Sequence, residues 1–277
     1  MTVFTEFQKT AEDVPAAPFL HIPRQACMDY ADATLDFTYA EALDKINVLS
    51  HLYHSRGYGH GQRIAMVLDN RAEFFLHFFA LNKLGVSIVP LNSGFLIEEM
   101  AYVIDHSDSC LVLSLPVHLE KVKQALATIT TPVQIVDSES MDTLAHSKAA
   151  VRDGEIDTET EAAVLYTSGT TGEPKGCMLN NDYFVSMGQW YVSIHGYCQL
   201  QYGRERMLAM VMSGGCIIQL DRFHASSWWQ TVRESKASCL HYLGVIPAIL
   251  LNLPEQADDN VGAQVNFGFG AGVDPKH

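Results

Sequence analysis

The chain has 277 residues, of which 48% are hydrophobic and 18% charged, and its 18 basic and 32 acidic side chains give a formal net charge of −14. This is the composition of a globular protein with a large core. An acidic chain without basic runs is a poor partner for nucleic acid or anionic lipid. No apolar run is long enough to cross a membrane, and residues 1–15 lack the apolar segment of a signal peptide. We therefore expect a cytoplasmic protein that binds neither nucleic acid nor membranes.

Helical and strand patterns alternate through the first half of the chain. A helix is expected to begin near Thr38, because Thr38 and Glu41 have the spacing of a capping box, and apolar residues then recur at helical spacing. Gly57 and Gly59 end this helix, and Asn70 is a candidate cap for the next one. We predict strands at 63–68, 86–90, 110–114 and 133–137, and further helices at 72–85, 96–106 and 117–127.

The same alternation continues after a polar, acidic segment that we interpret as a linker. Beyond it we predict strands at 162–168, 177–180, 216–220, 238–244 and 264–272, and helices at 181–200, at 226–235 and after Pro247. The pattern predicts an α/β fold of mostly parallel sheets flanked by helices. The predicted domains are an N-terminal α/β subdomain at 1–137, a linker at 138–161 and a second α/β subdomain at 162–277. Such sheets bind ligands beyond the carboxyl ends of their strands.

Cysteines and histidines form no pattern that indicates a disulfide or a metal site. The six cysteines are scattered without a Cys-x-x-Cys pair, and several lie in apolar runs, which predicts buried, reduced thiols. The twelve histidines are equally dispersed, and none has acidic or cysteine partners at metal-ligand spacing. We assign no protein metal ligands.

The most informative run is Tyr-Thr-Ser-Gly-Thr-Thr-Gly-Glu-Pro-Lys-Gly at 166–176. Its glycines allow close approach of a ligand to the backbone, its hydroxyls can donate hydrogen bonds to phosphate oxygens, and its lysine adds a positive charge. A Walker loop needs glycine directly before lysine and a helix after it, whereas here Pro174 intervenes and a strand is expected. The predicted phosphate-binding residues are Thr167, Ser168, Gly169, Thr170, Thr171, Gly172 and Lys175.

The full run resembles the signature loop of the adenylate-forming superfamily, which contains acyl-CoA synthetases, luciferases and the adenylation domains of peptide synthetases. The stretch 37–92 is also similar to that family. Near the end of the chain, Phe269-Gly270-Ala271-Gly272 matches the place where family members lay a small-residue turn against the adenine ring. The resemblance implies the fold of the N-terminal domain of these enzymes, and it adds Gly270, Ala271 and Gly272 to the predicted nucleotide-binding residues.

The resemblance implies an AMP-forming acyl-CoA ligase. In such an enzyme a carboxylate attacks the α-phosphorus of ATP in the presence of Mg²⁺, and the thiol of coenzyme A then displaces AMP. The implied cofactors are ATP, Mg²⁺ and coenzyme A, and the implied substrate is a small or carnitine-like carboxylic acid. Trp190, Tyr191, His195 and the strand around Tyr242 are expected to border the acyl group, or else are ordinary core aromatics. No catalytic residue is assigned, and a homodimer is compatible with the resemblance.

The chain departs from the family pattern in three places. It stops at His277, before the expected aromatic-Gly-x-Thr-Glu motif, and before the ribose-binding aspartate and the C-terminal lid domain with its catalytic lysine. Within the chain, 203–212 are too few residues for the strand, loop and helix that the family has there, so we expect a segment near 204–210 to be missing. A chain without the lid domain is not expected to complete the reaction.

Two other functions stay open at this point. One is an adenylation enzyme that passes the acyl group to an acceptor other than coenzyme A. The other is a non-catalytic nucleotide-binding remnant.

Overall fold

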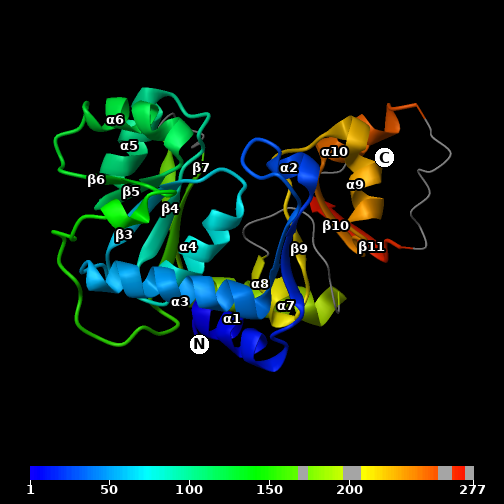
Figure 1. Cartoon of the computed structure of the whole chain (residues 1–277), viewed down its shortest axis with the longest axis horizontal. Helices are drawn as coiled ribbons and strands as arrows, with labels where there is room; N and C mark the ends of the chain where they lie inside the picture. Colours follow the sequence, from blue (N-terminus) through cyan, green and yellow to red (C-terminus); the bar gives the residue numbers. More distant parts are fainter. Residues whose placement is uncertain (168–173, 196–206, 255–263, 272–277) are drawn as a thin grey trace. The chain divides into compact units, whose positions relative to one another are not determined.

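The computed structural model describes residues 1–167, 174–195, 207–254 and 264–271 (Figure 1). Two compact units can be distinguished in the chain. The first unit comprises Met1–Gln8 and Leu43–Val185, and the second comprises Lys9–Ala42 and Ser186–His277. Both units draw on separate parts of the chain, so their boundaries do not coincide with the subdomains predicted at 1–137 and 162–277.

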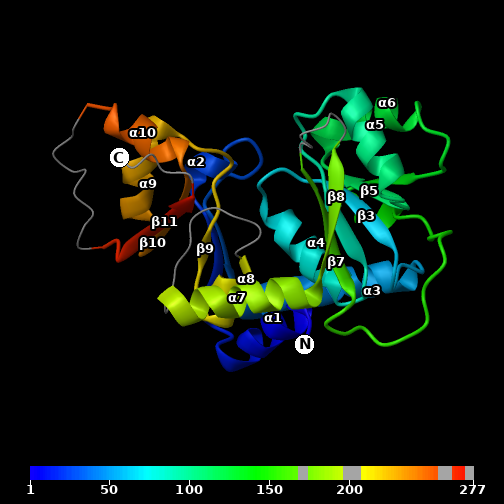
Figure 2. The same ribbon diagram turned by 180° about the vertical axis from the view of Figure 1, so that it is seen from behind.

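The first unit is built on a 6-stranded sheet with the strand order β6-β5-β3-β4-β7-β8. All neighbouring strands are parallel except β8, which runs antiparallel to β7 at the edge of the sheet (Figure 2). The strands are β3 (Arg63–Val67), β4 (Ser87–Pro90), β5 (Leu111–Ser114), β6 (Gln134–Asp137), β7 (Glu161–Thr167) and β8 (Lys175–Asn180). The predicted α/β fold with a mostly parallel sheet is confirmed, and β7 and β8 extend the sheet formed by the strands before the predicted linker.

Helices cover both faces of this sheet. In the sheet, β4 lies on one side of β3 and β5 on the other, so the chain moves in opposite directions along the sheet in the connections β3–β4 and β4–β5. Since both crossovers are right-handed, α4 and α5 lie on opposite faces of the sheet. Helices α5 and α6 share one face, where they pack in a core cluster with Val67, Val89 and Val112. The helical segments are α1 (Val3–Asp13), α3 (Tyr39–Ser55), α4 (Ala72–Asn82), α5 (Ile97–His106), η1 (Pro116–His118), α6 (Leu119–Leu126) and η2 (Met141–Thr143), of which α1 and α3 contribute residues to both units.

The starts of these helices show which capping predictions hold. At α3, the Thr38 backbone N–H donates to Glu41 Oε2 at 2.8 Å and the Glu41 N–H donates to Thr38 Oγ1 at 3.2 Å, so the predicted capping box is confirmed. The cap expected at Asn70 is wrong: Arg71, the next residue, occupies the N-cap position of α4 and makes no side-chain cap bond. Burial stabilises α4 instead, since almost every one of its side chains is in the core.

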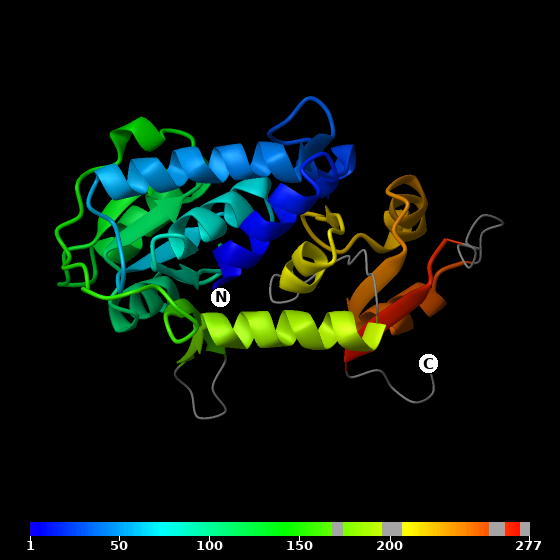
Figure 3. The same cartoon turned by 90° about the horizontal axis from the view of Figure 1, so that it is seen from below.

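The second unit contains two small sheets. The first has the order β2-β1-β9, and in the second β10 and β11 pair in parallel (orange and red in Figure 3). The strands are β1 (Pro18–Ile22), β2 (Leu35–Thr38), β9 (Ile217–Ile218), β10 (Cys239–Leu243) and β11 (Phe267–Ala271). The helical segments are α2 (Arg24–Cys27), α7 (Asn181–His195), α8 (Met207–Met212), η4 (Ala225–Ser227), α9 (Trp228–Glu234) and α10 (Val245–Leu251), with α7 beginning in the first unit.

Two predictions, on membrane-spanning segments and on cysteines, can be compared with the described residues. No helix among them has the length and apolar character that a membrane crossing requires. The described cysteines are all free, and Cys27, Cys216 and Cys239 are buried as expected. The prediction of buried thiols is wrong for Cys177, which is exposed because it lies on the edge strand β8.

Candidate functional site

The segment that resembles a phosphate loop connects the two strands of a hairpin. The last residue pairs of β7 and β8 are Tyr166 with Gly176 and Thr167 with Lys175. Since β7 runs parallel to β4, Thr167 stands at the carboxyl edge of the sheet, which is where α/β sheets bind ligands. The predicted residues Ser168, Gly169, Thr170, Thr171 and Gly172 lie outside the described residues.

The described ends of the hairpin are polar and exposed. Thr167 and Lys175 are both exposed, and within the described part of the chain no acidic group forms an ion pair with Lys175. Gly176 has a local packing role: a Cβ there would lie 3.0 Å from Tyr166 Cζ and 3.0 Å from Val164 Cγ1. The glycine therefore lets β8 lie against the side chains of β7.

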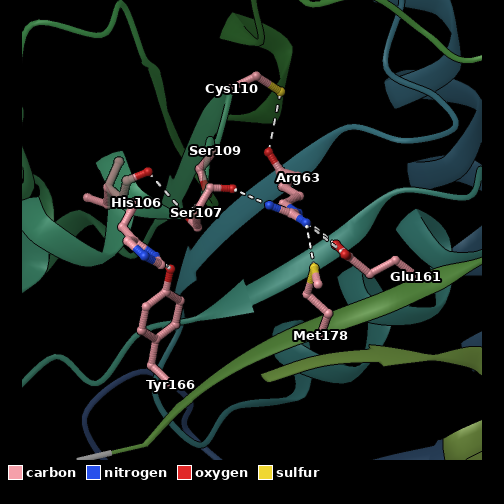
Figure 4. Close-up of polar contacts among 9 residues, drawn as sticks. Arg63, His106, Ser107, Ser109, Cys110, Glu161, Tyr166 and Met178 are labelled. Carbon is pink, nitrogen blue, oxygen red and sulfur yellow. Dashed lines mark hydrogen bonds and ion pairs between the residues drawn. The ribbon is translucent and has the colours of Figure 1, made fainter. Parts of the chain in front are cut away.

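Helix α5 bonds to β7 and to the residue directly before β8, which the sequence did not predict. His106 Nδ1 lies 2.7 Å from the Tyr166 hydroxyl (Figure 4), and the Tyr102 hydroxyl donates to the Pro174 carbonyl oxygen at 3.2 Å. Burial raises the pKa of Tyr166 to about 12, so its phenol is protonated at neutral pH and can donate to the imidazole. The signal that could have been used is the aromatic pair at positions i and i+4 of a predicted helix.

An ion pair occupies the opposite, amino edge of the same sheet. Arg63 donates to both carboxylate oxygens of Glu161, at 2.7 and 2.8 Å, and to the Ser107 carbonyl oxygen at 3.1 Å (Figure 4). The hydrogen bond to Glu161 raises the pKa of the Arg63 guanidinium above its ordinary value. This bidentate pair joins β3 to β7 across the start of β4.

A cavity of about 710 Å³ opens at this amino edge, lined among others by Arg63, Ser87 and Glu161. It therefore does not coincide with the predicted phosphate site, because Thr167 and Lys175 are at the other end of β7 and the hairpin. The volume of the cavity alone identifies no reacting group, whereas the hairpin end exposes a hydroxyl and an ammonium group.

The predicted adenine turn belongs to the second unit. A Cβ at Gly270 would lie 2.2 Å from Tyr242 Cε2 and 2.8 Å from the Tyr242 carbonyl oxygen. This glycine is thus required by the packing of a neighbouring strand, which is a reason for it that needs no ligand. The side chain of Ala271 and all of Gly272 lie outside the described residues.

The aromatics expected to border an acyl group are partly assembled. Tyr191 is buried and meets Phe269 edge to face, with ring centroids 5.4 Å apart, and His241 lies 5.8 Å from the same ring. Trp190 is 49% exposed and contacts Tyr191. The side chain of His195 is outside the described residues, and the acyl-binding role of this group stays a prediction.

The family model of the AMP-binding enzymes matches residues 7–276. The chain therefore belongs to the AMP-binding enzyme family, in agreement with the resemblance found at 166–176. It is similar to the crotonobetaine/carnitine–CoA ligases of Shigella dysenteriae serotype 1, at 24% identity over 249 residues, and of Proteus mirabilis, at 24% over 255 residues. These matches cover 80% of this chain and 48% of each relative, so the chain spans about half the length of the curated relatives it matches.

Solved structures show the same fold. The N-terminal domain of FACL13 from Mycobacterium tuberculosis superimposes with a TM-score of 0.81 at 20% identity, covering 97% of this chain and 69% of that domain. The o-succinylbenzoate CoA synthetase of Bacillus subtilis, solved with its acyl-adenylate intermediate, gives a TM-score of 0.77 at 20% identity, covering 98% of this chain and 68% of that one. At such identities the likeness establishes the fold, which is that of the N-terminal domain of adenylate-forming enzymes.

Proposed function

We propose that this chain is the ATP-holding portion of an AMP-forming acyl-CoA ligase that acts on a small carboxylic acid. The observation that carries the proposal is the β7–β8 hairpin, which pairs Thr167 with Lys175 at the carboxyl edge of a parallel sheet. Membership of the AMP-binding enzyme family and the similarity to CoA ligases support it. We also propose a cytoplasmic location. The proposed co-substrates are ATP and coenzyme A, and the proposed metal is Mg²⁺.

The proposed reaction has two steps. A carboxylate oxygen of the acid bonds to the α-phosphorus of ATP while the bond to the β-phosphate breaks and pyrophosphate leaves. The thiol sulfur of coenzyme A then bonds to the acyl carbon, the thiol proton is released, and AMP leaves. Mg²⁺ supplies positive charge to the phosphate oxygens during the first step.

The role that we propose for the hairpin is to bind the β- and γ-phosphates. Thr167 and the segment that follows offer hydroxyl and amide donors, and Lys175 offers a charge that no acidic group of the described residues neutralises. Catalysis at this place is then positioning and charge stabilisation, without covalent chemistry by the protein. Gly270, Ala271 and Gly272 remain candidates for contact with the adenine, although packing by Tyr242 already explains the first of them.

The proposal is tested by measuring pyrophosphate release from ATP with a panel of carboxylic acids. The 277-residue chain is compared with a longer form that adds the remaining length of its relatives. Release that depends on the acid supports the ligase, and coenzyme A dependence of AMP release then separates it from an enzyme with another acceptor. ATP binding without acid-dependent release by either form would instead favour a non-catalytic nucleotide-binding protein.

A single substitution tests the phosphate-binding role. Lys175→Ala is expected to weaken ATP binding by about tenfold or more, because a hydrogen bond to a charged group is worth roughly 1.5–3 kcal/mol. Binding of AMP, which lacks the β- and γ-phosphates, should change little. Calorimetric titration of both nucleotides measures the difference, and Lys148→Ala, at another exposed lysine, is the matched control. Equal losses for ATP and AMP would contradict the assignment.

A further inference from the structure

Helix α5 carries two aromatic side chains, one of which bonds to β7 and the other to the residue directly before β8. Tyr102 and His106 are one helical turn apart, and their rings stack with centroids 5.2 Å apart and an interplanar angle of 26°. Tyr102 bonds to the carbonyl oxygen of Pro174, directly before β8, and His106 bonds to the hydroxyl of Tyr166, near the end of β7. One face of one helix thus bonds to the hairpin on both sides of segment 168–173.

The rest of the sheet gives this end of the hairpin little lateral support. The register of β7 with β4 consists of the pair Ile88 with Ala163, close to the amino end of β7, and β4 ends at Pro90, which has no N–H to donate. On its other side β7 pairs with β8, which is itself the edge strand. Towards Thr167 the two strands stay paired with each other, but the position of this hairpin end relative to the rest of the sheet depends on contacts made by side chains.

Packing places the two anchoring hydroxyls where they can supply that support. The rings of Tyr102 and Tyr166 are partly buried against the core cluster that α5 shares with the sheet. The imidazole of His106 meets the Tyr166 ring edge to face, with centroids 5.8 Å apart. The hydroxyls are thus held by packed rings. The bond from Tyr102 fixes the backbone at Pro174, and the bond between Tyr166 and His106 joins the side chains of β7 and α5, both at little further cost in side-chain entropy.

We propose that Tyr102 and His106 are positioning residues that hold the two strands of the β7–β8 hairpin in the geometry that binds the β- and γ-phosphates of ATP. This inference rests on the function proposed above, because it assigns to α5 the placement of the paired Thr167 and Lys175 relative to the rest of the sheet. Neither aromatic side chain needs to touch the nucleotide. Loss of either side chain is expected to make the phosphate site less well preorganised and so to weaken ATP binding.

The test compares ATP with AMP in calorimetric titrations of single variants of the 277-residue chain. Tyr102→Phe and Tyr166→Phe each remove one anchoring hydroxyl without changing ring packing. Each is expected to raise the Kd for ATP by about 3- to 10-fold, the equivalent of one hydrogen bond, and to leave the Kd for AMP unchanged. His106→Leu should behave in the same way. His106→Asn, which keeps a polar atom near the position of Nδ1, should restore part of the affinity for ATP.

A matched control comes from the amino edge of the same sheet. The Tyr58 hydroxyl donates to Gln134 Oε1 at 2.8 Å, so Tyr58→Phe removes a comparable hydrogen bond far from Thr167. It is expected to lower the Tm by a similar amount while both nucleotide affinities stay at the wild-type values. The Tm of every variant is measured alongside, which separates a loss of stability from a loss of phosphate binding.

The outcomes distinguish this inference from the proposed function. If Lys175→Ala weakens ATP binding but Tyr102→Phe and Tyr166→Phe do not, the positioning role is wrong and the proposed function stands. If the phenylalanine variants weaken ATP and AMP equally, in step with the Tm, the two aromatics only stabilise the fold and the inference is overturned. If the wild-type chain binds neither nucleotide, the proposed function is wrong and the inference goes with it.

Discussion

Helices α4 and α10 have almost the same chemical character but opposite surroundings. Both are rich in large apolar residues, with the sequences AEFFLHFFALN and VIPAILL. In α4 nearly every residue is buried, whereas none of the residues of α10 is buried and Leu251 is 65% exposed. The apolar pattern therefore predicts that a helix forms but not how much of it is covered.

The difference follows from what each helix packs against. Helix α4 connects two parallel strands in the interior of the 6-stranded sheet. Its aromatic rings contact those of α1 and α7: the ring centroids of Phe79 and Phe7 are 4.4 Å apart, and those of Phe78 and Phe184 are 5.8 Å apart. Helix α10 follows β10, which belongs to a 2-stranded sheet. A helix becomes part of a core when several elements surround it.

The largest effect is expected from truncation of the α4 core. Phe79 is fully buried and its ring contacts those of Phe7 and Phe78. Phe79→Ala should lower the free energy of unfolding by about 3–5 kcal/mol, since it removes buried surface and leaves a cavity. Denaturant titration measures this. A loss below about 1 kcal/mol would mean that α4 is no better packed than α10, and the contrast between the two helices would fail.

An intermediate effect is expected from acidification, because α4 buries a histidine and α10 has no ionisable side chain. His77 lies beside the Tyr53 hydroxyl at 2.9 Å, and burial lowers its pKa from 6.5 to about 3. Below pH 6.5 the unfolded chain binds a proton that the native chain does not. Stability is therefore lost as the pH falls through this range, by about 1.4 kcal/mol per pH unit for this group.

Unfolding titrations at pH 7, 6 and 5 test this expectation. His77→Asn removes the titrating group and keeps a polar side chain for Tyr53, so its stability should depend less steeply on pH than that of the wild type. Identical slopes for the two proteins would show that His77 is not buried in its neutral form.

The smallest effect is expected on α10. Leu251→Ser changes a side chain that is 65% exposed, so the free energy of unfolding should change by less than about 0.5 kcal/mol. The same denaturant titration that is used for Phe79→Ala measures it. A loss of 2 kcal/mol or more in the free energy of unfolding would show that α10 is covered in solution, and the contrast between α4 and α10 would then be wrong.

Much of the first unit could be predicted from local sequence because its strands are continuous apolar runs and its helices have clear periodicity. The elements that were missed lack such signals. Helix α1 carries charged residues and was interpreted only as a segment unlike a signal peptide, and β1 is short and pairs with β9, which is far along the chain. Parallel pairing leaves no local trace, so the joining of β7 to the first sheet could not be derived from the order of the elements.

The candidate site could be predicted where its chemistry is contained in one run of residues. The hairpin at 166–176 is such a run, and the sequence predicts both of its strands. Its anchors were not predicted, because His106 is 60 residues from Tyr166 and Tyr102 is 72 residues from Pro174. The interpretation of Gly270 had the same difficulty, since the crowding by Tyr242 depends on the pairing of two distant strands.

The Arg63–Glu161 pair has a consequence for the order of events during synthesis of the protein. The two residues are 98 positions apart, so β3 to β6 are all synthesised before the carboxylate is made. At a rate of roughly 5–20 residues per second, Arg63 then waits for several seconds without its partner. During that interval the nascent sheet ends at β4, and its completion depends on the arrival of β7.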